Sequence, residues 1–240
     1  MKLPLLDAQE PLFPDTARAL DHPDGLLAAG GNLAVETLLS AYQKGIFPWY
    51  EQGQPILWWS PSARTVLYPA DIHISKSLRK MLRQKRYRIT TNTVFNDVIR
   101  ACAEPRAADR ENTQDNHTWI SQEMIAAYED LHQQGHAHSV EYWLDDELKG
   151  GLYGLVVGDV FCGESMFSRS SSASKVAFAH LASGLKQAGF RLIDCQIEND
   201  YLNTFGAQQI SRKQFVAGLR KSENQIIDWP DHLISTDTST

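Results

Sequence analysis

The sequence has few cysteines and no long hydrophobic run. Its three cysteines, Cys102, Cys162 and Cys195, lie far apart and form no CxxC pair, which favours reduced structural thiols over a disulfide framework. No stretch approaches the roughly 20 apolar residues that span a bilayer. The first residues are interrupted by Pro4 and Asp7 and do not form an apolar secretory segment. These features predict a cytoplasmic protein.

A convincing metal site is also missing. His132, His136 and His138 are close in sequence, but Gly135 is expected to break the helix between them. No cysteine or carboxylate completes a set with the usual ligand spacing. No motif supports a catalytic Cys–His pair either. We therefore expect no metal.

Positive charge is scarce except in one segment. The formal net charge is −6, from 23 Lys and Arg against 29 Asp and Glu. The stretch KSLRKMLRQKRYR, residues 76–88, holds seven of the basic residues and no acidic one. On a helix, spacings of three and four would gather four cations on one face: Lys76, Arg79, Lys80 and Arg83. Such a face could bind a polyanion or simply be solvated, and charge alone does not decide between these alternatives.

The 240 residues, 42% of them hydrophobic, suffice for one large domain or two smaller ones. Residues 12–60 are rich in Gly, Pro and aromatic residues. They contain a helix pattern over 33–44, capped near Asn32 and ended by Gly45, and two short strands follow within 55–69. Residues 69–73 resemble a domain boundary.

Helices and strands alternate after this boundary. Helices are expected over 75–86, 93–104 (capped by Thr93), 120–135 (capped by Ser121), 172–189, 199–207 and 211–220. Strands are expected at 87–92 and 190–197, with a three-stranded meander over 137–168 that turns at 145–146 and 158–159. Residues 105–117 predict a loop and 235–240 a frayed tail. The order helix, meander, helix, strand predicts an α+β layer with a central sheet covered by helices.

The expected strand within RLIDCQIEND, residues 191–200, has an unusual polar face. Side chains alternate along a strand, so Ile193 and Cys195 lie on one side and Asp194 and Gln196 on the other. An acid and an amide two residues apart fit a solvated face, and they equally fit a pair aimed into a cleft. Periodicity does not separate the two alternatives.

Seven stretches, taken in order and spacing, resemble the leucyl/phenylalanyl-tRNA–protein transferase family. They are PDGLLAAGGNL, AYQKGIFPWY, PILWWSP, HTWIS, GHAHSVE, FCGESMFSRSSSASK and LIDCQIEND, and they extend from about residue 23 to residue 206. The resemblance implies an α+β protein with a small N-terminal α/β domain, residues 1–70. It also implies a domain like the GCN5-related N-acetyltransferases over residues 71–240.

The resemblance also implies an activity. A member of this family moves Leu, Phe or Met from an aminoacyl-tRNA to the α-amino group of a protein that begins with Arg or Lys, which marks that protein for degradation. The donor is an ester and the product an amide, so the reaction is downhill and needs no ATP, metal or other cofactor. The expected partners are aminoacyl-tRNA and proteins with N-terminal Arg or Lys, with no membrane, and the protein is expected to be a monomer.

The resemblance places Asp194 and Gln196 beside the reacting ester. The attacking α-amine has a pKa of about 8, so the enzyme must orient it and accept its proton. A glutamine carbonyl is an acceptor but a very weak base. We therefore expect Gln196 to hold and polarise the amine, and Asp194 to orient Gln196 and to supply negative charge. The terminal hydroxyl of the tRNA could share in the proton transfer.

Further residues are assigned to the acceptor protein and to the aminoacyl group. Glu164, a carboxylate in apolar company, is expected to bind the basic side chain or the α-ammonium of the acceptor, and the alternative is an exposed residue at a strand end. The aminoacyl side chain needs an apolar pocket, which would reject β-branched donors by its shape. The candidates for this pocket are Phe161, Gly163, Met166 and Ile193, while Phe178 is expected to belong to the core.

Two tryptophans and the basic helix are assigned to the tRNA. The resemblance implies that Trp49 and Trp119 line a slot in which the terminal adenine stacks. Trp58 and Trp59 are expected in the core. The cations at 76, 79, 80 and 83 would bind acceptor-stem phosphates without reading sequence.

Two other functions remain open. An acetyl-CoA-dependent acetyltransferase would need a glycine-containing pyrophosphate loop before a helix, and RSSSASK, residues 169–175, has no glycine. A tRNA-binding module without activity would explain the basic helix but not the combination of Asp194, Gln196 and Glu164. The roles of Ser174 and Lys175, at the start of the expected helix, stay open. His117, where the family has a small residue, puts the surroundings of Trp119 in question.

Overall fold

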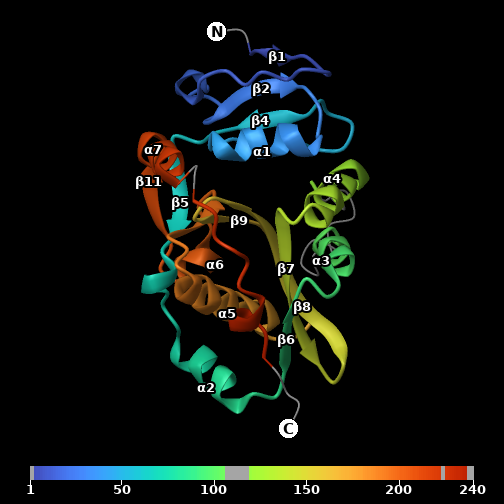
Figure 1. The fold of residues 1–240 in the computed structure, drawn as a ribbon, viewed down its shortest axis with the longest axis vertical. Helices are drawn as coiled ribbons and strands as arrows, with labels where there is room; N and C mark the ends of the chain where they lie inside the picture. Colours follow the sequence, from blue (N-terminus) through green and yellow to red (C-terminus); the bar gives the residue numbers. More distant parts are fainter. Residues whose placement is uncertain (1–2, 106–118, 223–224, 237–240) are drawn as a thin grey trace.

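The computed structural model describes residues 3–105, 119–222 and 225–236. They form two β-sheets with helices between and around them, and the smaller sheet lies at one end of the molecule (Figure 1). A mixed α and β fold was predicted, and this coarse prediction is confirmed. Across the described ranges, no helix is long and apolar enough to cross a bilayer.

The smaller sheet is built from the N-terminal residues. Its four strands lie in the order β1-β2-β4-β3, with β1 parallel to β2 and the other pairs antiparallel. The strands are β1 Leu5–Leu6, β2 Leu26–Gly30, β3 Phe47–Pro48 and β4 Leu57–Trp59, and the segment also contains a 3-10 helix, η1 Thr16–Arg18, and α1 Val35–Gln43. The side-chain oxygen of Asn32 accepts a hydrogen bond from the backbone of Ala34 at 2.9 Å, and Gly45 follows α1 with a φ of 75°. The expected helix and its stop are confirmed.

The larger sheet has seven strands in the order β11-β5-β10-β9-β8-β7-β6. They are β5 Ala63–Leu67, β6 Arg88–Thr91, β7 Ala137–Leu144, β8 Glu147–Val157, β9 Val160–Ser168, β10 Leu192–Gln196 and β11 Gln208–Ser211. β9 and β10 run parallel, and every other pair is antiparallel. β5 belongs to this sheet although it precedes residue 70, where the sequence suggested a domain boundary.

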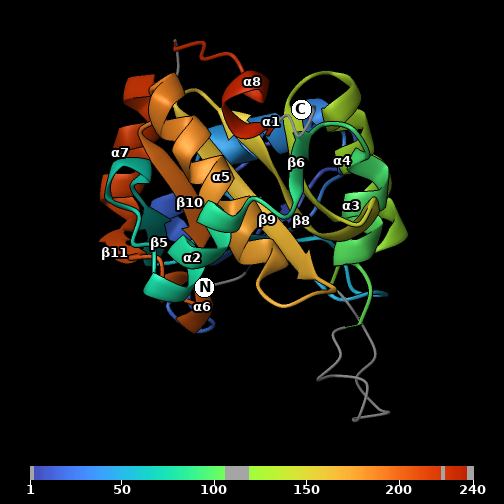
Figure 2. The same ribbon diagram turned by 90° about the horizontal axis from the view of Figure 1, so that it is seen from below.

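Helices cover both faces of the larger sheet. α1, α3 Phe95–Cys102 and α4 Gln122–Gln133 pack on one face, and α5 Ala173–Ala188, α2 Lys76–Gln84 and α8 Asp231–Ile234 on the other (Figure 2). Shorter elements complete the fold: η2 Pro69–Asp71, α6 Asp200–Asn203 and α7 Arg212–Ser222. Alternation along β10 separates the two cores, because Leu192 joins the first cluster and Ile193 the second.

Most expected elements are present, with three differences. Ser121 caps α4 by accepting a hydrogen bond from Met124 at 3.2 Å, as predicted. Thr93 does not cap α3, which begins after Val94 without a side-chain cap. The strands β1, β2, β3 and β11 and the short helix α8 were not predicted. Of the expected frayed tail, Thr236 forms an isolated bridge with Ile89, while 237–240 and most of the loop 105–117 lie outside the described residues.

Candidate active site

A cavity opens where β9 and β10 stop pairing. Their parallel ladder runs from Leu192–Val160 to Asp194–Cys162 and ends there, although β9 continues to Ser168. The cavity holds about 920 Å³. Apart from the basic helix, every predicted site residue lines it: Trp49, Trp119, Phe161, Gly163, Glu164, Met166, Ile193, Asp194 and Gln196. The cavity therefore brings together residues from four separate stretches of the sequence.

Asp194 lies at the base of this cavity with its charge already paired. Its side chain is fully buried, and both carboxylate oxygens accept hydrogen bonds from Arg64 on β5 at 2.7 Å. One of these oxygens also accepts from the backbone N–H of Gln196 at 2.9 Å. A bidentate pair of this kind combines charge with fixed geometry. Asp194 thus contacts Gln196 through the backbone of Gln196, and its carboxylate is paired with Arg64.

Arg64 ties the site to the N-terminal region and to α7. Its remaining nitrogen donates to the carbonyl of Gly45 at 3.2 Å. Its guanidinium lies between the rings of Phe47 and Phe215, 4.7 and 4.5 Å from their centroids. Cation–π contacts of a desolvated guanidinium are each worth roughly 2 kcal/mol. These contacts hold the buried cation in one position beneath β10.

Gln196 ends β10 in a strained backbone conformation. Its φ is 61°, in the left-handed region, and the register with β5 shifts between Asp194 and Gln196. The side-chain amide donates to Glu164 on β9 at 2.8 Å. A non-glycine residue in this region costs of order 1–3 kcal/mol and persists only where its surroundings enforce it. Here the bond from its own N–H to Asp194 enforces it.

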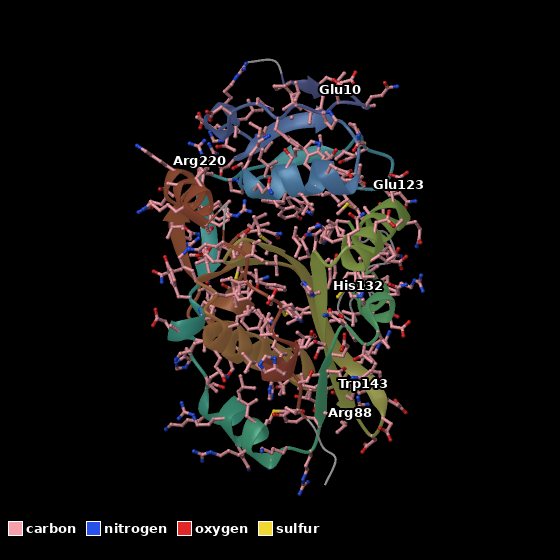
Figure 3. All side chains as sticks on the ribbon, viewed as in Figure 1. Glu10, Arg88, Glu123, His132, Trp143 and Arg220 are labelled. Carbon is pink, nitrogen blue, oxygen red and sulfur yellow. The ribbon has the colours of Figure 1, made fainter. Side chains whose placement is uncertain are left out.

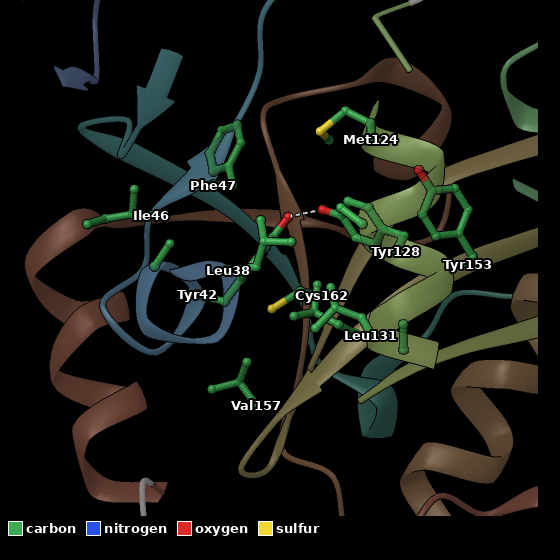
Figure 4. Close-up of a cluster of buried hydrophobic side chains, with 14 of the residues drawn as sticks. Leu38, Tyr42, Ile46, Phe47, Met124, Tyr128, Leu131, Tyr153, Val157 and Cys162 are labelled. Atoms are coloured by element: carbon green, nitrogen blue, oxygen red, sulfur yellow. Dashed lines mark hydrogen bonds between the residues drawn. The ribbon is translucent and has the colours of Figure 1, made fainter. Parts of the chain in front are cut away.

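Glu164 faces the cavity with hydroxyl groups and an amide as its partners. Tyr128 on α4 donates to it at 2.9 Å, and the Tyr128 hydroxyl meets that of Tyr42 on α1 at 2.5 Å (Figure 4). None of the ion pairs among the described residues involves Glu164. Burial raises the pKa of Glu164 to about 7, against the opposing effect of the Tyr42 and Tyr128 hydroxyls. Its carboxyl can therefore change charge near neutral pH.

The residues expected to bind the aminoacyl side chain line an apolar part of the cavity wall. Phe161 and Ile193 are buried, whereas Gly163 and Met166 are half-buried. Phe178, expected to be core, is indeed buried among the α5 residues, but it also lines the cavity. Phe178 thus belongs to the core and lines the cavity at the same time.

The four tryptophans at positions 49, 58, 59 and 119 lie only partly where they were expected. Trp49 is 44% exposed and Trp119 half-buried, and both line the cavity. Trp58 is fully buried, and its ring N–H donates to the carbonyl of Gly30 at 2.8 Å. Trp59 is only half-buried and lies 5.7 Å from Trp49 between ring centroids.

The basic helix forms a surface of its own. Its four cations, together with Gln84, line a shallow hollow that shares no residue with the large cavity. Ser75 caps α2 by accepting a hydrogen bond from Leu78 at 3.3 Å. The expected helix is present, but its cations lie apart from the large cavity.

Ser174, at the first turn of α5, lines the cavity and hydrogen-bonds the hydroxyl of Tyr201 at 2.8 Å. Lys175 lies 5.3 Å from the centroid of the same ring. Among the described residues, no group of three or more His, Cys, Asp and Glu could hold a metal ion. His132 and His138 each stack on a different aromatic ring, Phe95 and Trp229.

Sequence reasoning missed Arg64 and the two tyrosines. Arg64 offered a signal, because it is a cation in an otherwise apolar strand, SARTVLYP, and a buried charge needs a partner. That partner is 130 residues away and could not be named. Tyr42 and Tyr128 gave no signal, since at helical spacing they are indistinguishable from core aromatic residues.

Comparisons with known proteins place the chain in a family. A family profile for "Leucyl/phenylalanyl-tRNA protein transferase" matches residues 66–220, and one for the N-terminal domain of that family matches residues 31–62. A curated leucyl/phenylalanyl-tRNA–protein transferase from Cellvibrio japonicus is 52% identical over 238 residues, 99% of each chain. One from Pseudomonas syringae pv. tomato is 56% identical over 203 residues, 85% of this chain and 86% of the relative.

Among solved structures, L-PGS from Bacillus licheniformis is 11% identical, with a TM-score of 0.37 over 72% of this chain and 53% of the other, which is too distant to establish a shared fold. The sequence relatives are far closer, and the two profile matches include strands of both sheets. The chain belongs to the leucyl/phenylalanyl-tRNA–protein transferase family.

Proposed function

We propose that the protein moves Leu, Phe or Met from an aminoacyl-tRNA to the α-amino group of proteins that begin with Arg or Lys, and that this marks those proteins for degradation. One observation carries the proposal, namely that the expected acceptor, aminoacyl and adenine contacts all line one cavity. The site needs no cofactor for this reaction, because aminolysis of an ester is downhill. We place the reaction in the cytoplasm, and we propose an acetyltransferase-like layout for the larger sheet.

Gln196 is the proposed contact for the attacking amine. Its amide N–H₂ donates to Glu164, so its carbonyl oxygen remains to accept a hydrogen bond from the amine and hold it towards the ester. Asp194 and Arg64 act from behind as positioning residues, because the carboxylate is fully buried and bonded to the guanidinium and to the Gln196 backbone. Positioning of this kind is a main part of rate enhancement in bimolecular reactions.

Glu164 is the proposed proton acceptor as well as the anion that binds the acceptor. An α-ammonium with a pKa of about 8 can pass its proton to a carboxylate whose pKa is near its own, and the pKa of Glu164 is about 7. The neutral amine then attacks the ester carbonyl, a C–N bond forms and the C–O bond to the ribose breaks. Glu164 returns the first proton to the leaving ribose oxygen. The second proton leaves the attacking nitrogen as the amide forms, and the regenerated Glu164 carboxylate takes it up and releases it to water.

The two substrates enter over different surfaces in this proposal. The terminal adenine stacks on Trp49 and Trp119, where base stacking contributes roughly 1–3 kcal/mol. The acceptor stem lies along Lys76, Arg79, Lys80 and Arg83. The donor side chain fills the apolar wall formed by Phe161, Gly163, Met166 and Ile193.

The direct test is transfer by the purified protein from radiolabelled Leu-tRNA to a protein with N-terminal Arg. We expect label on that protein, none on a matched protein with N-terminal Glu, and no acetylation when acetyl-CoA replaces the tRNA. Absence of transfer to the Arg N-terminus would remove the proposal. Acetylation of that N-terminus would favour the acetyltransferase alternative.

A competition assay isolates the acceptor role of Glu164. Glu164→Gln keeps the size of the side chain and removes its charge. We expect the variant to lose most of its preference for Arg over uncharged N-termini. A variant that kept the full preference would show that Glu164 does not select the acceptor.

A further inference from the structure

The segment that follows α7 packs against the back of the aminoacyl pocket. Residues 225–236 lie outside both family profiles, which match residues 31–62 and 66–220. They include Trp229 and the short helix α8, which packs on α5 and β6 (Figure 2). We call residues 229–236 the C-terminal strap. Trp229 does not line the cavity, so its contacts lie behind the cavity wall.

Trp229 is sandwiched between the pocket wall and β7. Its ring lies 5.5 Å from the ring of Phe161, at an interplanar angle of 36°. On the other side it stacks on His138 at 4.3 Å and 2°. Phe161 itself is 1% exposed and lines the cavity. Phe161 is therefore a wall with the cavity on one side and an indole on the other.

A polar network keeps the indole in this place. The carboxylate of Asp231 accepts hydrogen bonds from the hydroxyl of Thr91 and, at 3.2 Å, from the side chain of Asn92. The same Asn92 side chain hydrogen-bonds Nδ1 of His138 at 3.1 Å. Asn92 therefore holds both His138, on which Trp229 stacks, and Asp231, which follows Trp229 in the strap. Such a network restricts the position of the ring more than burial alone would.

Two further contacts anchor the end of the strap. The backbone N–H of Thr236 donates to the carbonyl of Ile89 at 2.9 Å. Ile234 is fully buried against Gly184 of α5, so closely that a Cβ at Gly184 would lie 2.3 Å from Ile234 Cγ1. A larger residue at position 184 would therefore collide with Ile234. The substitution Gly184→Ala should displace the strap without altering Trp229 itself.

We propose that Trp229 sets the depth of the aminoacyl pocket by holding Phe161 from behind, and that the C-terminal strap thereby takes part in choosing between donor side chains. This inference rests on the proposed function. Removal of the indole leaves space into which Phe161 can retreat, so the pocket deepens. A deeper pocket suits the larger phenylalanyl side chain and loses contact with the leucyl side chain. Trp229 is a positioning residue, because it touches Phe161 and not the substrate.

The test compares donors in Trp229→Ala and Trp229→Leu. We measure kcat/KM for Phe-tRNA and Leu-tRNA with one Arg-initiated acceptor, and we expect the Phe/Leu ratio to rise by about 10-fold, the lower end of what one methylene group is worth in an apolar pocket. The change should lie mainly in KM for the Leu donor. Gly184→Ala should move the ratio in the same direction.

Trp143→Ala is the matched control. Trp143 lies at the far end of β7, where its ring N–H donates to Thr90 at 2.8 Å, much as Trp229 approaches Thr91 at 3.4 Å. Arg88 lies over its ring at 4.7 Å, and Trp143 does not line the cavity. Figure 3 labels Arg88 and Trp143 near each other, at the end of the molecule away from the smaller sheet. We expect this variant to lose stability but to keep the wild-type Phe/Leu ratio.

The outcomes separate the two claims. If the wild-type protein transfers neither donor, the proposed function fails. If it transfers both, and the folded Trp229→Leu and Gly184→Ala variants keep its Phe/Leu ratio, the role of the strap is refuted while the function stands. If Trp143→Ala shifts the ratio equally, the effect is a general loss of packing and the inference is overturned.

Discussion

Two carboxylates line the same cavity, and of these Asp194 is paired with an arginine whereas Glu164 is in no ion pair of the described residues. Asp194 is fully buried, and both of its oxygens are bonded to Arg64. Glu164 is half-buried, has hydroxyl and amide partners, and has a pKa raised to about 7. Gln196 joins the two, because its backbone donates to Asp194 and its side chain to Glu164.

The two surroundings suit different roles, one for a residue that positions its neighbour and one for a residue that exchanges a proton. The Asp194 carboxylate is buried and bonded to Arg64 through both oxygens, so it is held in one place and can position a neighbour. Within the part of the chain that the structure describes, Glu164 has no such ion pair, and its pKa of about 7 is near that of the amine that we propose it deprotonates. Pairs of acids with such different surroundings commonly divide the roles in an active site.

The largest effect on stability should come from breaking the buried ion pair of Arg64 and Asp194. Arg64→Met leaves the Asp194 carboxylate uncompensated in the interior, which should lower the free energy of unfolding by about 3–5 kcal/mol. Urea denaturation measures this loss. Most of it should return in the double variant Arg64→Met/Asp194→Leu, which removes both charges.

Arg191 and Asp159 provide the control for that experiment. They form a similar two-bond pair, at 2.8 and 2.9 Å, but Arg191 is partly exposed. Arg191→Met should therefore cost only about 1 kcal/mol. Equal losses at the two pairs would mean that burial does not distinguish them.

The ionisation of Glu164 should appear in the pH dependence of stability. Because its folded-state pKa is raised from 4.5 to about 7, the stability contributed by the protonated form is fully present below about pH 4.5 and is lost as the pH rises through 7. Each pKa unit corresponds to 1.36 kcal/mol, so the loss amounts to at most about 3 kcal/mol. Glu164→Gln should remove this dependence.

The difference in unfolding free energy between wild type and Glu164→Gln, followed from pH 4 to 8, isolates this effect. The exposed helix carboxylate Glu36 controls for the loss of one negative charge, and Glu36→Gln should leave the pH dependence as it is in wild type. A difference that stayed constant with pH would show that the pKa of Glu164 is not raised.

Gln196 links the two acids, and its replacement should mainly affect catalysis. Gln196→Ala and Gln196→Gly should each lower the single-turnover transfer rate by about 10²-fold, because the amine loses its hydrogen-bond acceptor. Glycine adopts a φ of 61° without strain, so Gln196→Gly should be more stable than Gln196→Ala by about 1 kcal/mol. Unchanged transfer rates in both variants would exclude the proposed contact.

The basic helix lies away from this pair and should affect binding alone. Arg79→Gln and Arg83→Gln should each reduce the slope of log affinity for tRNA against log salt by about 1, with the rate at saturating tRNA unchanged. Filter binding between about 50 and 200 mM salt gives this slope. A flat salt dependence in the wild-type protein would contradict tRNA binding by this helix.

Local patterns predicted the elements well, and long-range pairing explains what they missed. The Ser121 cap and the turn at residues 145–146 depend on near neighbours, and both are present. The polar face of β10 was also readable, because alternation places Asp194 and Gln196 together. Periodicity could not show which of the two acids has a cation, since Arg64 reaches Asp194 only through the pairing of β5 with β10.

The same limit explains the other omissions. Tyr42 comes from the N-terminal region and meets Tyr128 across 86 residues of sequence. β11 is a four-residue strand whose partner, β5, lies far earlier in the chain. The role that we propose for Trp229 depends on its contacts with His138 and Phe161, which are distant in sequence. Each of these residues resembles ordinary core or loop until the sheets are assembled.

The pH dependence of single-turnover transfer tests the division of roles between the two acids most directly. With an Arg-initiated acceptor, the wild-type rate should rise with pH through a step near 7, from Glu164, and a second step near 8, from the amine. Glu164→Gln should lose the step near 7 and keep the one near 8, whereas Asp194→Asn should be slower with the step near 7 retained. A Glu164→Gln profile that keeps the step near 7, or an Asp194→Asn profile that loses it, would contradict this account.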